Sequence, residues 1–204
     1  HGTQTLSYSQ FQPGLRHFLS ENGLVAHEQQ LLKTLVLGDP LTSAETLPTL
    51  LNEFFQSHPN PLFCAITRST AEELAGRGWL INEFAQETRL HIPTYTLEGD
   101  EKRKLRTAWN KFKRENHQVV EWTHDEPASV ALAKEVTELW RADKEVSDRE
   151  VRFLTRPIIY EAEHDTRRFF VKNADGAVVG LYIFDPLYEN GNVIGYSTAF
   201  KRRM

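Results

Sequence analysis

The order of strand and helix patterns along the chain constrains its fold more than any other sequence feature. Alternating apolar residues and turn signals predict strands, and apolar residues at helical spacing predict helices. In the first half, the expected strands lie at 15–20, 24–29, 33–37, 62–67, 80–84 and 88–92, and the expected helices at 44–55 and 70–75. In the second half, the expected strands lie at 118–122, 168–172, 177–184 and 193–199, and the expected helices at 128–141 and 147–162. The halves therefore read βββαβαββ and βααβββ, which predicts an α+β fold with mixed sheets.

A basic helix is expected between the two halves. Residues 98–116 hold seven basic and four acidic side chains, a net charge of +3 in a chain whose formal net charge is −4. The apolar residues of this segment recur at i, i+3, i+4 and i+7, which predicts one buried helical face; they are Leu105, Ala108, Trp109 and Phe112. Such a helix is either a solvated connector with intrahelical ion pairs or a docking surface for an anionic partner, such as an RNA backbone or an anionic lipid surface.

The element orders of the two halves complement each other. An acyltransferase fold of the GNAT type runs βααβββαβαββ, so the first half matches its later elements and the second half its earlier ones. We therefore expect tandem GNAT-like repeats, with a first repeat at 1–97, the connecting helix at 98–117 and a second repeat at 118–204. On this reading the native protein continues past Met204.

Composition indicates the class of protein and the compartment in which it works. The chain has 204 residues, 40% of them hydrophobic, which is typical of a globular protein. Its one cysteine, Cys64, allows no internal disulfide and favours a reducing compartment. No run approaches the roughly 20 apolar residues of a membrane span, and no signal peptide is visible. We expect a cytoplasmic location, with a place at the inner face of the membrane as an option.

Several chemistries lack their motifs. The sequence has no zinc-ligand spacing, no GxSxG and no glycine-rich phosphate loop. The acetyl-CoA signature of GNAT enzymes is also absent, since its slot in the first half reads Gly38-Asp39-Pro40-Leu41-Thr42. Pro40 has no N–H and interrupts any run of backbone amides that would hold a pyrophosphate. We expect no cofactor and no metal.

The segment 184–191 carries polar groups between two expected strands. It holds Asp185, Tyr188 and Glu189 and ends on the turn signal Asn190-Gly191. It reads either as a plain hairpin loop or as part of a site. Lys201, Arg202 and Arg203 follow at a strand end, where a cation facing a cleft binds phosphate or carboxylate.

Three stretches resemble a known family. They are Val36-Leu37-Gly38-Asp39-Pro40, the run 97–111 and Val179-Gly180-Leu181-Tyr182, and together they resemble the C-terminal catalytic domain of phosphatidylglycerol lysyltransferases over residues 15–203. The resemblance implies two GNAT-like repeats joined by the basic helix. It also implies transfer of an aminoacyl group from charged tRNA to a lipid headgroup.

The resemblance assigns roles to individual residues. Contact with tRNA or lipid phosphate falls to the basic residues Lys102, Arg103, Arg106 and Lys113. Arg202 is similar to the arginine that follows the fourth strand of the second repeat. The family often has an Asp-Leu-Met-Arg-like run there, and this chain reads Ala199-Phe200-Lys201-Arg202, without the acid. Lysine is therefore not implied as the donor amino acid.

The hypothesis from the sequence is an aminoacyltransferase with a lipid, or another small amine or hydroxyl, as acceptor. We assign catalysis to Asp185, Glu189 and Arg202, with either acid as the base for the acceptor. We assign substrate binding to the aromatic hydroxyls Tyr182, Tyr188 and Tyr196. Two alternatives stay open: an acyltransferase that uses acyl-CoA or acyl-carrier protein, and a non-catalytic module that binds RNA or anionic membrane.

Overall fold

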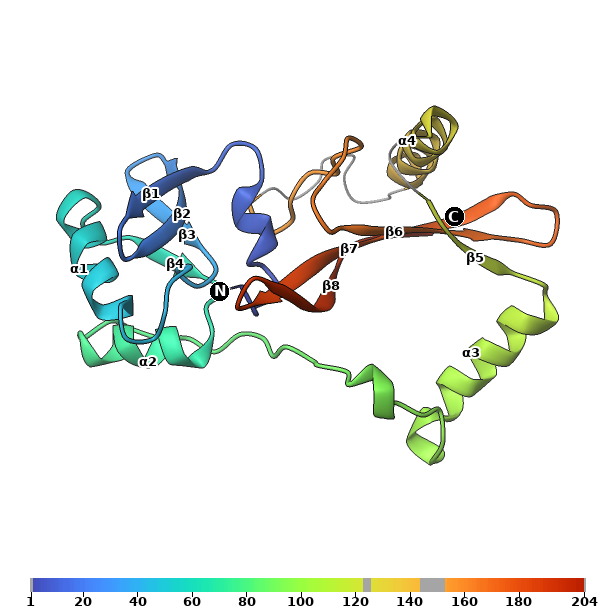
Figure 1. Cartoon of the computed structure of the whole chain (residues 1–204), viewed down its shortest axis with the longest axis horizontal. Helices are drawn as coiled ribbons and strands as arrows, with labels where there is room; N and C mark the ends of the chain where they lie inside the picture. The colour runs from blue at the N-terminus through green and yellow to red at the C-terminus, as the bar shows by residue number, and fades with distance from the viewer. Residues whose placement is uncertain (1, 123–125, 144–152, 204) are drawn as a thin grey trace. The chain divides into compact units, whose positions relative to one another are not determined.

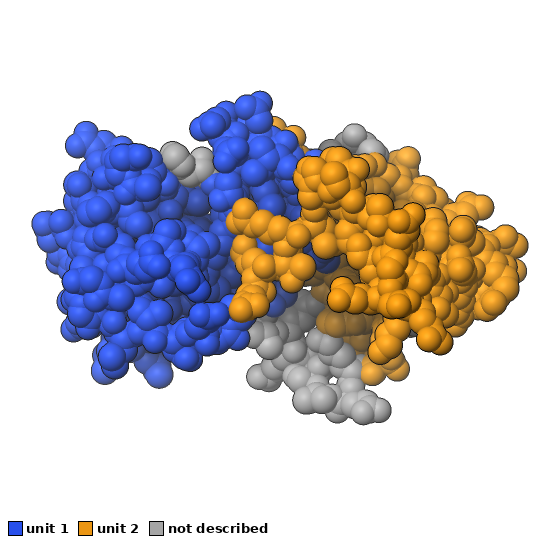
Figure 2. All heavy atoms as spheres, turned by 90° about the horizontal axis from the view of Figure 1, so that it is seen from below, with its two compact units in different colours: residues 1–85, 150–158, 185–199 blue, residues 86–149, 159–184, 200–204 orange. Residues whose placement is uncertain are grey.

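The computed structural model describes residues 2–122, 126–143 and 153–203, which form two compact units. Unit 1 comprises residues 1–85, 150–158 and 185–199, and unit 2 comprises residues 86–149, 159–184 and 200–204 (Figure 2). The domain boundaries expected from the sequence are a different division of the chain and stay a prediction.

Unit 1 is built on a four-stranded sheet with the order β1-β2-β3-β4 (Figure 1). Its strands are β1 (Arg16–Ser20), β2 (Gly23–Gln30), β3 (Lys33–Leu37) and β4 (Leu62–Cys64). The first three form an antiparallel meander, and β4 pairs in parallel with β3. The connection between β3 and β4 is α1 (Leu47–Ser57), as a parallel pair requires. A short 3-10 helix, η1 (Tyr8–Phe11), precedes the sheet, and α2 (Arg68–Gly76) follows it.

The core of unit 1 lies between α1 and the sheet. Leu50 and Phe54 of α1 are fully buried against Val25 and Val36 of β2 and β3. Helix α1 begins at Leu47, later than the expected start at residue 44, because Ser43 accepts the Thr46 N–H inside the preceding turn. Pro48 then falls in the first helical turn, where a missing N–H costs nothing.

His27 of β2 is buried in this aromatic core. Its ring centroid lies 4.5 Å from that of His58 and 5.7 Å from that of Phe54. Burial, followed by the nearby cationic groups of His58, Arg16 and His17, lowers the pKa of His27 from 6.5 to about 4. The folded state therefore holds His27 neutral at pH values where the unfolded chain binds a proton.

We expect acid to destabilise unit 1 through this histidine. Because the folded pKa lies below the unfolded value, the stability is complete above pH 6.5 and is lost as pH falls toward 4. Between about pH 7.5 and about pH 4.5, protonation linked to His27 should lower the free energy of unfolding by about 2 kcal/mol. Thermal unfolding of wild type and His27→Phe at both pH values measures it. Equal pH dependence in the two proteins would show that His27 is not the responsible group.

A second sheet has the strand order β5-β6-β7-β8, and its residues up to 184 and from 200 onward belong to unit 2. Its strands are β5 (Gln118–Glu121), β6 (Arg167–Lys172), β7 (Val178–Glu189) and β8 (Asn192–Arg203). Strands β5, β6 and β7 are successively antiparallel. The end of β7, residues 185–189, and the first part of β8, residues 192–199, belong to unit 1. Helix α4 (Pro127–Ala142) buries Ala133, Val136 and Thr137.

The remaining elements of unit 2 are η2 (Ile92–Thr94), η3 (Asp100–Lys102) and α3 (Arg103–Arg114). Helix α3 confirms the expected basic helix, but its apolar face is not buried: Leu105 is 49% and Trp109 48% exposed. The expectation of a buried face was therefore wrong within the described residues. Amphipathic spacing predicts a helix without saying what covers its apolar side.

Three other sequence expectations are corrected. The expected strands at 80–84 and 88–92 are irregular, and Leu80 is fully exposed, because apolar alternation makes no strand without a neighbour to complete the hydrogen-bond ladder. Residues 153–162 are not helical, and 147–152 lie outside the described residues. Asp185–Glu189 is part of β7, so the loop is reduced to Asn190-Gly191.

The mixed α/β class with two sheets is as expected from the sequence. The hairpin predicted at Asn190-Gly191 is also present, with φ of 50° and 77°, as a two-residue type I′ turn requires. None of the helices among residues 2–122, 126–143 and 153–203 has the length and apolar character to cross a membrane.

Candidate functional site

The candidate site of unit 1 is a cavity at the end of β3. Its volume is about 380 Å³, and its lining includes Gln4, Asp39, Thr42, Tyr188 and Glu189. The cavity holds two carboxylates, from Asp39 and Glu189, and none of the described residues that line it is a lysine or an arginine. Its chemistry therefore suits a cationic or hydrogen-bond-donating group.

Two buried glutamines fix the backbone at Asp39. Gln10, fully buried, donates from Nε2 to the Asp39 carbonyl at 2.7 Å. Gln4 accepts the Asp39 N–H at 3.1 Å and donates to the Ala65 carbonyl. Gly38 has φ of +70°, and a Cβ there would lie 2.8 Å from Gln4 Oε1 and 2.9 Å from Gln10 Nε2. Only glycine fits this approach, which explains the Gly38-Asp39 pair.

The Asp39 carboxylate is also held. Its Oδ1 accepts the backbone N–H of Thr67, the residue before α2, at 2.8 Å. This bond fixes the carboxylate beside the cavity. A carboxylate held in this way needs no reorganisation to bind a cation, which favours binding.

The backbone amides of residues 38–41 are all used within unit 1. Gly38 N donates to Cys64 O at 2.9 Å, and Leu41 N donates to Leu24 O at 2.8 Å. The Asp39 N–H goes to Gln4, and Pro40 has none. Residues 38–41, in the slot that binds the pyrophosphate of acetyl-CoA in GNAT enzymes, therefore leave no amide for a phosphate.

Asp185, one of the expected catalytic acids, is 1% exposed and paired with Arg156. Arg156 donates from Nη2 to Oδ1 at 2.6 Å and from Nε to Oδ2 at 3.0 Å. Both carboxylate oxygens thus accept from one guanidinium, the strong bidentate geometry. The Arg156 guanidinium also lies 5.5 Å from the ring centroid of Tyr8. Both oxygens of the Asp185 carboxylate are therefore engaged by Arg156, and its catalytic role stays a prediction.

The other expected residues of unit 1 lie on the β7–β8 hairpin. Tyr188 and the exposed Glu189 line the cavity together, and the Tyr188 N–H donates to the Gly2 carbonyl at 3.1 Å. Tyr196 of β8 is 40% exposed. The structure thus brings Tyr188 and Glu189 into one cavity, which Asp185 and Tyr196 do not line.

Arg202 and Tyr182 belong to unit 2. Arg202 of β8 is 2% exposed, and its guanidinium carbon lies 4.2 Å from the ring centroid of Trp140 on α4. This is a cation–π arrangement in a buried setting. Tyr182 is half-buried in β7 opposite Phe169 of β6.

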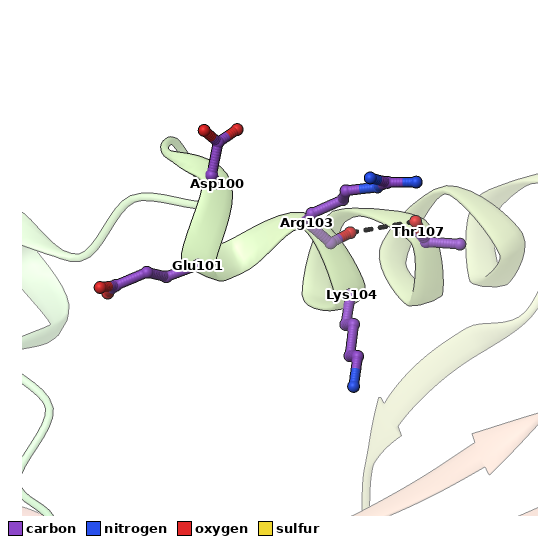
Figure 3. A pocket seen from close by; sticks show the side chains of 5 residues that line it. All are labelled: Asp100, Glu101, Arg103, Lys104 and Thr107. Carbon is purple, nitrogen blue, oxygen red and sulfur yellow. Dashed lines mark hydrogen bonds between the residues drawn. The ribbon is translucent and has the colours of Figure 1, made fainter.

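Most of the residues of η3 and α3 that were expected to contact phosphate have local partners. Lys102 Nζ donates to Thr96 O at 2.7 Å, and Arg106 Nη1 donates to Leu97 O at 2.6 Å. Lys113 Nζ lies 5.5 Å from the ring centroid of Trp109. Arg103 lines an open hollow with Asp100, Glu101, Lys104 and Thr107, and Figure 3 shows Asp100, Glu101 and Lys104 pointing in three different directions. The hollow therefore has no convergent set of ligands for a small molecule.

Sequence reasoning missed Asp39, Arg156 and Trp140 as site residues. The sequence around Asp39 could have indicated a site residue, because an acid directly after a strand and before a proline has a fixed position at the strand end. Arg156 lies in an irregular segment, and no sequence pattern there indicates a site residue. Trp140 belonged to the apolar side of the expected helix, which hid its contact with Arg202.

Comparison with known proteins supports the resemblance found in the sequence. The family model described as phosphatidylglycerol lysyltransferase, C-terminal, matches residues 1–203. A phosphatidylglycerol lysyltransferase of Bacillus subtilis (strain 168) is 26% identical over 199 residues, covering 94% of this chain and 23% of that protein. The chain thus spans about a quarter of the length of this curated relative.

Two solved structures share the fold. The structure of L-PGS from Bacillus licheniformis matches with a TM-score of 0.83 and 21% identity, covering 98% of this chain and 62% of that one. The C-terminal domain of a putative lysylphosphatidylglycerol synthetase from Agrobacterium fabrum matches with a TM-score of 0.74 and 15% identity, covering 93% and 60%. Both likenesses confirm the predicted fold class.

Proposed function

Because the chain belongs to the family of phosphatidylglycerol lysyltransferase C-terminal domains, we propose that it is a transferase that moves an aminoacyl group from charged tRNA to a lipid headgroup. The observation that carries the proposal is the family match over residues 1–203. The names of the relatives supply the lipid acceptor and the aminoacyl group. The tRNA donor is what the resemblance of the sequence implies.

The cavity of unit 1 is the amine subsite of the proposed reaction. An aminoacyl ester carries an α-ammonium group, and Asp39 and Glu189 supply negative charge to a cavity of about 380 Å³. Asp39 is fixed by Thr67 and suits the binding of the ammonium. Glu189 is exposed and has no such fixed bond among the described residues, so it suits proton transfer.

In the proposed step, an acceptor hydroxyl attacks the ester carbonyl of the aminoacyl group. The bond between the acceptor oxygen and the carbonyl carbon forms, and the bond from that carbon to the ribose oxygen of tRNA breaks. Glu189 takes the hydroxyl proton and returns it to the ribose oxygen that leaves. The reaction needs no enzyme-bound intermediate, so positioning and stabilisation of the developing oxyanion provide most of the catalysis.

The remaining expected residues keep proposed roles. Arg202 is proposed to stabilise negative charge on a substrate, and Asp185 to position the β7–β8 hairpin through Arg156. Substrate contact is proposed for the three tyrosines Tyr182, Tyr188 and Tyr196. Four cations of η3 and α3 are proposed to contact phosphate: Lys102, Arg103, Arg106 and Lys113.

An assay with labelled donors tests the proposal. The chain is incubated with detergent-dispersed phosphatidylglycerol and either tRNA charged with labelled amino acids or labelled acetyl-CoA. We expect label in the lipid fraction with charged tRNA and none with acetyl-CoA, because residues 38–41 have no amide left for a pyrophosphate. Transfer from acetyl-CoA alone would establish the acyl-CoA alternative. No transfer from charged tRNA would contradict the aminoacyltransferase.

A further inference from the structure

Helix α3 exposes an apolar face that its sequence pattern had led us to expect inside the protein. Leu105 and Trp109 are 49% and 48% exposed, Ala108 is exposed, and none of the twelve helical residues is buried. A surface helix normally turns such a stripe toward a core. The stripe of α3 is therefore a surface that needs a partner.

The rest of the helix is strongly basic. Residues Arg103–Arg114 carry six basic side chains and no acidic one. Arg103, Lys104 and Arg114 form no ion pair with an acid among the described residues. The side chains of Arg103 and Lys104 point in different directions in Figure 3, so the charge is spread over a surface rather than gathered in a cleft. This distribution is complementary to an extended anionic surface.

The aromatic rings of the stripe distinguish between two anionic partners. Trp109 and Phe112 stack on each other, with centroids 5.6 Å apart and planes 10° apart, and His117 stacks on Phe112 at 5.4 Å. Single-stranded nucleic acid is held by bases that stack on free aromatic faces. Here Phe112 has a ring on each side, and Trp109 has Phe112 on one side and Lys113 Nζ 5.5 Å from its centroid. The exposed Leu105 offers a base nothing to stack on, whereas it suits hydrocarbon.

A basic helix with Trp, Phe and Leu on its apolar side is typical of helices that lie in the plane of a membrane surface. We propose that α3 docks on an anionic phospholipid bilayer. Leu105 and Trp109 enter the boundary between headgroups and acyl chains, and the basic residues contact lipid phosphates. The proposal extends the lipid acceptor of the proposed function, but its evidence is the exposed face and charge of α3.

Strand β5, directly after α3, adds apolar surface next to this helix in the sequence. Val119 and Val120 are 57% and 37% exposed, and all four residues of β5 are exposed. The stack of Phe112 on His117 ties the end of α3 to the residue before β5. We use the term docking surface for helix α3 with its apolar residues Leu105, Trp109 and Phe112. Strand β5 follows this surface in the sequence and is not part of it.

Vesicle binding in the absence of any donor tests the proposal. The chain is mixed with vesicles of phosphatidylcholine containing phosphatidylglycerol, and with vesicles of phosphatidylcholine alone, at several salt concentrations, and the bound fraction is measured by co-sedimentation. We expect binding to the anionic vesicles that weakens as salt is raised.

Three variants separate the contributions of apolar burial and of charge to vesicle binding. Leu105→Gln with Trp109→Gln should weaken vesicle binding about tenfold and keep its salt dependence, because it removes apolar burial only. Arg103→Gln with Lys104→Gln should weaken binding about tenfold at low salt and flatten the salt dependence. Leu31→Gln with Leu32→Gln is the matched control, since these leucines are 98% and 95% exposed in unit 1 and should leave binding unchanged.

Four outcomes would overturn the proposal. One is the absence of binding to anionic vesicles at low salt, and another is equal binding by the Leu105→Gln, Trp109→Gln protein and wild type. A third is binding of uncharged tRNA that the apolar variant weakens by the same factor, which would make the stripe an RNA surface. The fourth is a dimer in solution that the apolar variant dissociates, which would make the stripe a contact between copies.

Failure here is distinguishable from failure of the proposed function. Transfer to phosphatidylglycerol dispersed in detergent needs no docking on a bilayer. Loss of vesicle binding with transfer in detergent retained would reject only the docking surface. Vesicle binding without any transfer would reject only the aminoacyltransferase. Unfolding temperatures of the variants, which we expect to match wild type because the changed residues are exposed, show that each protein is folded.

Discussion

Replacing Asp185 by alanine is expected to lower the free energy of unfolding by about 3–5 kcal/mol. The change leaves the Arg156 guanidinium, 4% exposed, without the carboxylate that accepts from Nη2 at 2.6 Å and from Nε at 3.0 Å. A buried charge that loses a bidentate carboxylate retains its desolvation cost and loses the attraction of that carboxylate. Denaturant unfolding of wild type and Asp185→Ala measures the difference.

An exposed pair provides the control. Arg167 and Glu121 form the same kind of two-bond contact at 2.8 Å, with side chains 47% and 44% exposed. Glu121→Ala should cost less than about 1 kcal/mol, because solvent screens an exposed pair. The double change Arg156→Met with Asp185→Leu should recover most of the loss, since apolar residues of similar size often replace a buried ion pair without cost. Equal losses for Asp185→Ala and Glu121→Ala would mean that burial does not set the strength of this pair.

Sequence periodicity located the helices and most strands, because the spacing of apolar residues is a local property. Helix α3 is an example, since Leu105 and Trp109 lie on one face as expected. Whether that face is buried depends on which other segments pack on it, and periodicity holds no information on that point. The expected strands at 80–84 and 88–92 failed for the same reason, since a strand also needs a neighbour.

The candidate site was predicted only in part. Tyr188 and Glu189 were named from the polar hairpin segment, and the structure brings both to one cavity. Their neighbour Asp39 comes from a strand end about 150 positions earlier in the sequence, and Arg156 reaches Asp185 from 29 positions away. Such long-range contacts are set by the topology of the sheet and by irregular segments, and no spacing within either segment indicates them.

The second large effect concerns Glu189. Glu189→Gln keeps the size and shape of the side chain and removes its charge and its ability to take a proton. If Glu189 is the base of the proposed transfer, the rate of transfer to lipid should fall about a hundredfold, the lower end of what general base catalysis contributes. The fold should be unaffected, since the side chain is exposed. Initial rates at saturating charged tRNA measure the change, and Asp175→Asn, an exposed acid in the turn between β6 and β7, serves as the control that should stay at the wild-type rate.

Comparison with Asp39→Asn separates the two carboxylates of the cavity. The asparagine oxygen still accepts the Thr67 N–H, so the loop before α2 keeps its bond while the negative charge is lost. A residue that binds the ammonium of the aminoacyl group in both ground and transition states changes KM and leaves kcat near wild type. A base acts only as the acceptor loses its proton, so its loss lowers kcat. We therefore expect a raised KM for Asp39→Asn and a lowered kcat for Glu189→Gln. If both variants raise KM alone, the cavity binds the amine and the base lies elsewhere; if neither changes either constant, the cavity is not part of the transfer site.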